Sequence, residues 1–185
     1  MKRLDDSFED LLWEGNQAWS TGRKDLAVRY YQMLIERFPD NPNGYNRLGA
    51  VTAESGDLAQ AKWYFARALE CDGRHAPTLS NLGNISLEEG DLDEAIAFYG
   101  LALGSDPDYA PAHHNLAVAY RQKGQLGTSV RHLKLAQRLE RRRDALDAAH
   151  QGDTRRRYVR MDRRFAWWWI PALLLIMGIL GRAIR

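Results

Sequence analysis

GAVTAESGDLAQAKWYFARAL, residues 49–69, returns 34 residues later as GNISLEEGDLDEAIAFYGLAL, residues 83–103. Both copies begin with glycine, place Gly-Asp at the same point and continue through an alanine to an aromatic residue. Self-similarity at a fixed period of this length is typical of repeat architectures. The pattern therefore predicts a stack of similar units instead of one irregular core.

The period continues without a gap on both sides of this pair. After an N-terminal segment, 1–7, it divides the chain into four frames, 8–41, 42–75, 76–109 and 110–143. The eighth position of the frames is small (Gly15, Gly49, Gly83 and Ala117), and the fifteenth is always glycine (Gly22, Gly56, Gly90 and Gly124). We therefore expect four copies of one structural unit.

Each frame predicts two helices. Apolar residues recur at helical spacing on both sides of the glycine turn, as in Leu79, Leu82 and Ile85. Asp57 and Asp91 follow the turn glycines, where a carboxylate caps the second helix. Gln60 and Glu94 stand three residues later, as a capping box requires.

Small residues at the eighth and twentieth positions let two antiparallel helices approach closely, and the aromatic at the twenty-fourth position fills the space beside them. Pro39 and Pro107 follow the second helices, where proline prevents further helix. This pattern of small residue, aromatic and proline resembles the tetratricopeptide repeat family over residues 8 to about 141. The resemblance implies an all-α fold, a right-handed α-solenoid of four helix-turn-helix repeats.

The resemblance also implies that the first helices line a concave groove that binds an extended peptide or a partner helix. The polar residues expected to face it are Asn16, Arg47, Asn81, Asn84, His114, Asn115 and Arg121, with Asn43 and Asn46 nearby. Asparagine is unfavourable inside helices, but its amide both donates to and accepts from a peptide backbone. Asn81 and Asn115 resemble the asparagine ladder of some family members. The alternative is that these side chains are solvated or pack between repeats.

Some family members, found on partners of chaperones, bind an acidic C-terminus through a carboxylate clamp. Asn16 matches the first asparagine of that clamp, whereas the remaining positions hold Leu12, Arg47, Pro77 and Asn81 in place of lysine, asparagine, lysine and arginine. A co-chaperone role is therefore only a minor alternative.

No catalytic motif accompanies the repeats. His113 and His114 are adjacent, so a helix directs them differently, and no Cys, Asp or Glu stands at metal-ligand spacing around them. We expect His113 to pack between helices. The single Cys71 makes no intrachain disulfide. The prediction is a non-enzymatic chain that binds no metal or cofactor.

Helix-compatible residues continue after the fourth turn to His150, which predicts an extended last helix, 126–150, that caps the stack. A basic neck, 151–164, follows, and its six arginines are Arg155, Arg156, Arg157, Arg160, Arg163 and Arg164. Such a run can bind nucleic acid, but its position directly before an apolar segment favours anionic lipid headgroups. Nucleic acid is accordingly an improbable partner.

The segment 165–184, which contains FAWWWIPALLLIMGIL, predicts one C-terminal transmembrane helix. It is apolar on every side, and its only charge, Arg182, lies near the far end and can snorkel. Trp167, Trp168 and Trp169 suit the membrane interface. Ten arginines lie between Arg138 and Arg164 and two follow the span, which predicts the repeats on the cytoplasmic side of a single-pass, tail-anchored protein.

The charge distribution supports two functional parts. There are 12 basic and 19 acidic residues before Gln125, and 14 and 5 from there on, so the acidic repeats would favour a partner with a basic or mixed surface. The first hypothesis is an adaptor that recruits a protein partner to a membrane. The alternative is a structural subunit of a membrane assembly, such as a secretion, pilus or organelle-division apparatus.

The predicted location is the bacterial inner membrane, because 21 arginines against five lysines suit a GC-rich bacterial genome. The N-terminus has no apolar run of the kind a signal peptide needs. The alternative location is the mitochondrial outer membrane, since a short span between arginines also resembles the anchors sorted there. Partner identity and oligomeric state stay open.

Overall fold

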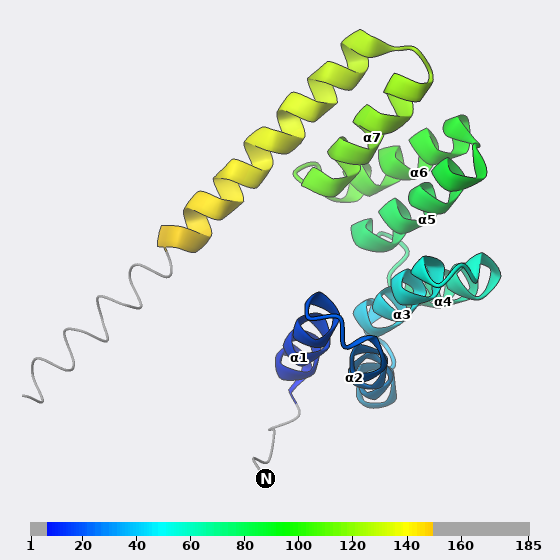
Figure 1. Cartoon of the computed structure of the whole chain (residues 1–185), viewed down its shortest axis with the longest axis vertical. Helices are drawn as coiled ribbons and strands as arrows, with labels where there is room; N and C mark the ends of the chain where they lie inside the picture. Colours follow the sequence, from blue (N-terminus) through cyan, green and yellow to red (C-terminus); the bar gives the residue numbers. More distant parts are fainter. Residues whose placement is uncertain (1–6, 150–185) are drawn as a thin grey trace, which may run out of the picture. The chain divides into compact units, whose positions relative to one another are not determined.

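The computed structural model describes residues 7–149, and every regular element among them is an α-helix (Figure 1). The helices are α1 (Phe8–Ser20), α2 (Lys24–Arg37), α3 (Pro42–Glu54), α4 (Leu58–Cys71), α5 (Ala76–Glu89), α6 (Leu92–Ser105), α7 (Ala110–Gln122) and a last helix over 126–149. The predicted all-helical fold is confirmed for this range. Among these residues, the boundary between two compact units falls after Leu139.

The glycine turns between paired helices are as predicted. Gly56 and Gly90 have φ values of 91° and 87°, in the left-handed region that an L side chain rarely adopts. Asp57 Oδ1 then accepts from the backbone N–H of Gln60 at 3.0 Å, and Asp91 Oδ1 from that of Glu94 at 3.2 Å. A capping box also needs a return bond, in which the Glu94 carboxylate accepts from the N–H of the capping residue. That part of the prediction is wrong, because the Glu94 carboxylate accepts from the Ser86 hydroxyl at 2.8 Å instead.

The small residue at the eighth position meets the aromatic at the twenty-fourth, also as predicted. A Cβ added to Gly49 would lie 2.5 Å from the Phe65 ring, and one added to Gly83 would lie 2.6 Å from the Tyr99 ring. Phe65 and Tyr99 are themselves fully buried. The paired helices are therefore close enough that only hydrogen fits between the α-carbon and the ring.

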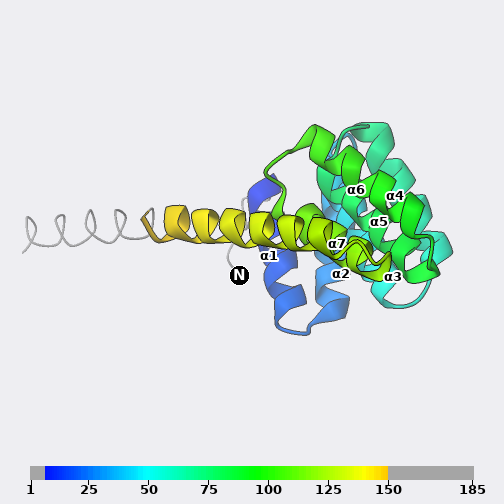
Figure 2. The same cartoon turned by 90° about the horizontal axis from the view of Figure 1, so that it is seen from above.

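Consecutive hairpins pack so that the first helices come together. α3 contacts α5 and α5 contacts α7, whereas no comparable contact joins α2 to α4 or α4 to α6 in the described part of the chain. We call the side formed by α1, α3, α5 and α7 the inner side and the side formed by α2, α4 and α6 the outer side. Figure 2 shows one such hairpin, α1 and α2, joined by its short turn.

The core runs between the hairpins as a series of small clusters. Leu11, Tyr31 and Leu34 of the first repeat pack with Leu48 of the second. Phe65 of the second repeat packs with Ile85 of the third. Each repeat thus buries its apolar residues against its neighbour, as a solenoid requires.

The start of the last helix packs on α7. Ser129 is buried and its hydroxyl donates to the Ala117 carbonyl at 2.7 Å, and Ala136 is only 1% exposed. Leu133, on the same helix, stays 37% exposed, so this helix covers the end of the stack along a narrow apolar stripe.

No helix in the range 7–149 is long and apolar enough to cross a membrane. The basic neck at 151–164, its six arginines, the predicted span at 165–184 and the three tryptophans all lie outside the described residues. They stay predictions from the sequence.

Candidate partner-binding surface

Asn81 and Asn115 occupy the same position in successive first helices, and each hydrogen-bonds to the preceding repeat. Asn81 Nδ2 donates to Asn46 Oδ1 at 2.9 Å, and Asn115 Nδ2 donates to Asn84 Oδ1 at 2.7 Å. Both donors are partly exposed, and no hydrogen bond to their side-chain oxygens is found within residues 7–149. The two amides are thus oriented by the fold and keep an acceptor for another molecule.

Asn16 and Asn84 hold buried tyrosines. The Tyr31 hydroxyl donates to Asn16 Oδ1 at 3.1 Å, and the Tyr99 hydroxyl donates to Asn84 Oδ1 at 2.8 Å. Burial raises the pKa of both phenols, so each is a neutral donor at physiological pH. These amides therefore have a structural role that the sequence analysis did not assign.

The sequence does contain a signal for this pairing. Asparagine at the ninth position accompanies tyrosine at the twenty-fourth in the first and third repeats, whereas the second repeat combines Ala50 with Phe65. A buried hydroxyl needs a partner and a phenyl ring does not. Comparing these two positions across the repeats would have separated Asn16 and Asn84 from the groove candidates.

A polar chain joins the second repeat to the third. Asn46 Oδ1 accepts from Asn81, as above, and also from the Thr78 hydroxyl at 3.1 Å. Because Thr78 donates its only proton there, it accepts from His75 Nδ1 at 2.7 Å. Burial, the largest cause, lowers the pKa of His75, which keeps this imidazole neutral, and the bond to Thr78 fixes its proton on Nδ1.

The other predicted groove residues differ in their surroundings. Arg47 is partly buried on α3, and its Nε is the one buried side-chain N or O atom without a hydrogen-bond partner in the described part of the chain. His114 and Arg121 are exposed on α7. All three lie on inner helices. Neither His114 nor Arg121 takes part in the hydrogen bonds of Asn81 and Asn115.

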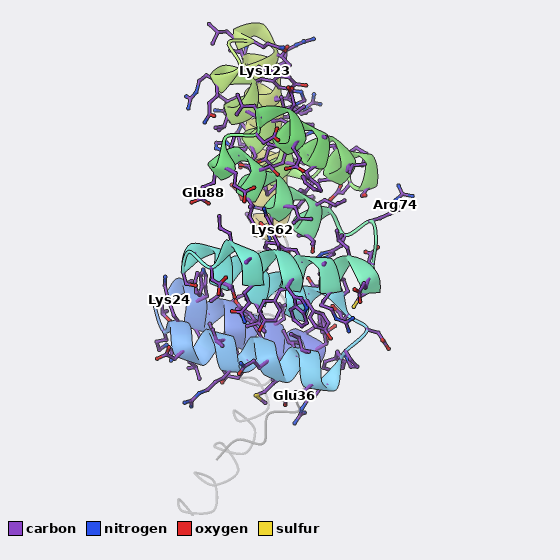
Figure 3. The ribbon with its side chains drawn as sticks, turned by 90° about the vertical axis from the view of Figure 1, so that its right-hand side faces the viewer. Lys24, Glu36, Lys62, Arg74, Glu88 and Lys123 are labelled. Atoms are coloured by element: carbon purple, nitrogen blue, oxygen red, sulfur yellow. The ribbon has the colours of Figure 1, made fainter. Side chains whose placement is uncertain are left out.

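The outer side has an aromatic hollow that the sequence analysis missed. It lies between α2, α3 and α4, has a volume of about 740 Å³ and includes Tyr45, Trp63, Tyr64 and Arg67. The Arg67 guanidinium lies 5.8 Å from the Tyr45 ring centroid and pairs with Glu70. Figure 3 shows α2 and α4, with Glu36 and Lys62 labelled on them. Its lining residues come from three helices of two successive repeats, so no single frame of the sequence contains them.

His113 packs between helices, as expected, and does so through a second histidine. Its Nδ1 lies 3.0 Å from His132 Nδ1 on the last helix, and its Nε2 lies 3.1 Å from the Pro107 carbonyl oxygen. The carbonyl requires a proton on Nε2, so Nδ1 of a neutral His113 accepts from His132. Burial, then His113, then Arg131 lower the pKa of His132.

Comparisons with known proteins agree with the repeat pattern. The family described as "Tetratricopeptide repeat" matches residues 11–41 and 110–143, and "TPR repeat" matches 83–124. No curated protein matches the chain. No group of three or more metal-ligating side chains occurs within residues 7–149.

Solved structures share the fold. A crystal structure of MamA is 21% identical with a TM-score of 0.56, and covers 76% of this chain and 82% of its own. A structure titled for Pseudomonas aeruginosa pilF is 20% identical with a TM-score of 0.63, and covers 76% and 64%. At these identities the likeness concerns the fold alone.

A Thermobaculum terrenum O-GlcNAc transferase mutant is 28% identical over 65% of this chain, with a TM-score of 0.57, but only 23% of the transferase is covered. The match therefore spans a small part of that enzyme. The 34-residue period, the glycine–aromatic contacts and the three family matches together support the conclusion that the chain is a tetratricopeptide repeat protein.

Proposed function

We propose that the chain is a non-enzymatic adaptor that uses its inner side to bind a protein partner and is held at a membrane by residues 165–184. Tetratricopeptide repeats generally bind proteins, and the similar folds of MamA and pilF are compatible with such a role. The observation that carries the proposal is the pair of amides on Asn81 and Asn115, each oriented by a bond to the preceding repeat.

An oriented amide suits an extended partner. The side-chain oxygens of Asn81 and Asn115 accept from backbone N–H groups of any sequence, because every residue except proline carries one. Successive first helices pack about 8–10 Å apart, so two such amides bind one segment at two points. The segment crosses the inner side instead of entering a closed pocket.

The membrane part of the proposal rests on the sequence. Residues 165–184 contain a single charge, and the six arginines from Arg155 to Arg164 precede them. Basic residues near a bilayer surface gain roughly 1 kcal/mol each from anionic lipids. The bacterial inner membrane, with the repeats in the cytoplasm, is the location we propose.

Site-specific photocrosslinking in intact cells tests the binding side. A photoreactive residue replaces His114, which is exposed on the inner helix α7, or, as the matched control, the exposed Arg29 on α2. We expect a discrete crosslinked product from position 114 and none from position 29. Equal products from both positions, or none from 114, would contradict the proposal.

Membrane attachment is tested separately. The full chain should stay with membranes after alkaline carbonate extraction and dissolve only in detergent, whereas a variant lacking residues 165–184 should be released. Extraction of the full chain by carbonate would contradict the proposed membrane attachment and leave the proposed partner binding untouched.

The crosslinking experiment also tests the alternative. A crosslinked product made only of this chain would favour a structural subunit of a membrane assembly.

A further inference from the structure

Arg47 is the unusual member of the sixth position of the repeats. This position holds Trp13, Arg47, Asn81 and Asn115 in the four first helices. The two asparagines donate to the preceding repeat, as described above, whereas Arg47 Nε is buried without any hydrogen-bond partner. An arginine here therefore does not replace the link that asparagine makes.

The positive charge of Arg47 is also uncompensated inside the protein. No acidic side chain within residues 7–149 forms an ion pair with it, although Glu54 pairs with Lys24 and Glu89 pairs with Lys62. A buried donor without a partner is rare in folded proteins and calls for a water, an ion or a ligand. A guanidinium that has lost part of its hydration and forms no ion pair with a carboxylate favours an anion.

Several groups sense this charge. Burial raises the pKa of Tyr31 and of Tyr109, and the charge of Arg47 opposes both shifts. Burial lowers the pKa of His75, Asp72 opposes that shift, and Arg47 adds to it. These groups come from the first three repeats, and Arg47 itself lies on α3, one of the inner helices.

We propose that Arg47 binds a carboxylate of the partner segment that occupies the inner side. The guanidinium presents donors in a fork that matches a carboxylate, and such charge-assisted pairs are stronger than neutral hydrogen bonds. The inference rests on the proposed function and adds to it the chemistry of the partner: an acidic residue next to stretches held through their backbone by Asn81 and Asn115. Although the repeats are acidic as a whole, this point on them is cationic.

Selection of peptides on the full chain, purified in detergent, tests the inference. The probe is a library of random 12-residue peptides displayed on phage by their C-terminal ends, so that only side-chain carboxylates are present. We expect the enriched peptides to share Asp or Glu at one position, and the same selection on Arg47→Met to lose this preference. An acid-free consensus on the wild type, or an unchanged consensus on Arg47→Met, would overturn the inference.

One enriched peptide is then synthesised in an acidic form and with Gln or Asn at the shared position. The amide form should bind the wild type roughly 10- to 100-fold more weakly, the range expected for a hydrogen bond to a charged group. On Arg47→Met the two peptides should bind within about twofold of each other, whereas Arg29→Met should keep the wild-type ratio. Equal binding of both peptides to the wild type overturns the inference even where Arg47→Met fails to fold.

Further arms separate the remaining outcomes. A free C-terminus on a synthetic peptide distinguishes a terminal carboxylate from a side-chain one: tighter binding only with the free terminus contradicts a side-chain partner. Arg47→Lys keeps the charge but loses the fork, and should fall between wild type and Arg47→Met. Absence of any enriched peptide on the wild type removes the proposed binding function as well, whereas enrichment without an acid removes this inference alone.

Discussion

The second and third repeats have the same scaffold and different surfaces. In both, a glycine at the eighth position packs against a buried aromatic ring. A Cβ added to that glycine would lie 2.5 Å from the ring in the second repeat and 2.6 Å from it in the third. Their aromatic residues differ by one hydroxyl, since Phe65 stands where the third repeat has Tyr99. Only Tyr99 needs the amide of Asn84. The added hydroxyl of Tyr99 is therefore accompanied by an asparagine that accepts its hydrogen bond.

Their outer faces differ more. α4 exposes Trp63, at 56%, beside Arg67, whereas α6 has Ala97 and the 58% exposed Leu101 at the same positions. None of these four residues touches the glycine–aromatic contact. Positions that hold the helices together repeat, whereas exposed positions of the same helix differ between the two repeats.

The largest expected effect is at the shared scaffold. Gly83→Ala should lower the free energy of unfolding by about 1–3 kcal/mol, because the methyl group overlaps the Tyr99 ring and forces the helices apart. Gly49→Ala should cost a similar amount against Phe65. Urea denaturation followed by circular dichroism measures both.

Gly100 is the matched control, because it is also a helical glycine but an added Cβ there meets nothing within 4 Å. Gly100→Ala should stabilise the protein by about 0.5–1 kcal/mol. A stable Gly83→Ala variant, or a comparable loss in Gly100→Ala, would contradict the steric explanation.

The next effect distinguishes the two repeats. Asn84→Ala should cost about 1–3 kcal/mol, since it leaves the buried Tyr99 hydroxyl without an acceptor. Adding Tyr99→Phe recreates the Ala50–Phe65 pair of the second repeat and should recover part of that loss. The remainder reflects the bond from Asn115. A double-mutant cycle measures the coupling, and strictly additive losses would refute it.

Removing the helix caps should destabilise the second and third repeats equally. Asp57→Ala and Asp91→Ala each remove an acceptor for the third backbone N–H of a second helix, and each should cost about 1 kcal/mol. Thermal melts of both variants provide the measurement. A loss in only one of them would mean that the caps are not equivalent.

The smallest effect extends the comparison to the fourth repeat, where His132 replaces Tyr64 and Phe98 of the second and third. The pKa of His132 in the folded protein lies below the ordinary histidine value of about 6.5, so the unfolded chain binds more protons. The stability from neutral His132 is present above about pH 6.5 and is lost as the pH falls from there toward the folded pKa.

We therefore expect the melting temperature to fall less between pH 7.5 and 5.5 in His132→Gln than in the wild type. His75 keeps part of the slope, because its pKa is also lowered. Identical slopes for wild type and His132→Gln would exclude a contribution from the histidine pair.

The sequence predicts the repeat itself because the requirements are local. A glycine that must face an aromatic ring, an aspartate that caps a helix and a glycine with positive φ each identify themselves by residue type and spacing. Interactions between repeats are harder to predict from the sequence. Asn81 and Asn115 occupy equivalent positions, yet one donates to Asn46 and the other to Asn84, because Ala50 offers no acceptor in the second repeat.

The candidate site could be predicted only in part for the same reason. The sixth position identifies Arg47, but that its Nε lacks a partner depends on what surrounds it in three dimensions. The hollow beside Trp63 depends on how α2, α3 and α4 pack, and His113 meets His132 only because the last helix packs on α7. None of these distances follows from a residue pattern within one frame.

The four turn glycines also mark positions between which distances along the stack can be measured. Gly22, Gly56, Gly90 and Gly124 each close the same end of a hairpin, at steps of 34 residues, and nothing lies within 4 Å of a side chain added there. Open turns of this kind tolerate attached groups. With Cys71 replaced, fluorophores beside two of the turns, at Ser55 and Lys123, would report by energy transfer whether occupation of the inner side bends the repeats, without either dye touching the surface that binds.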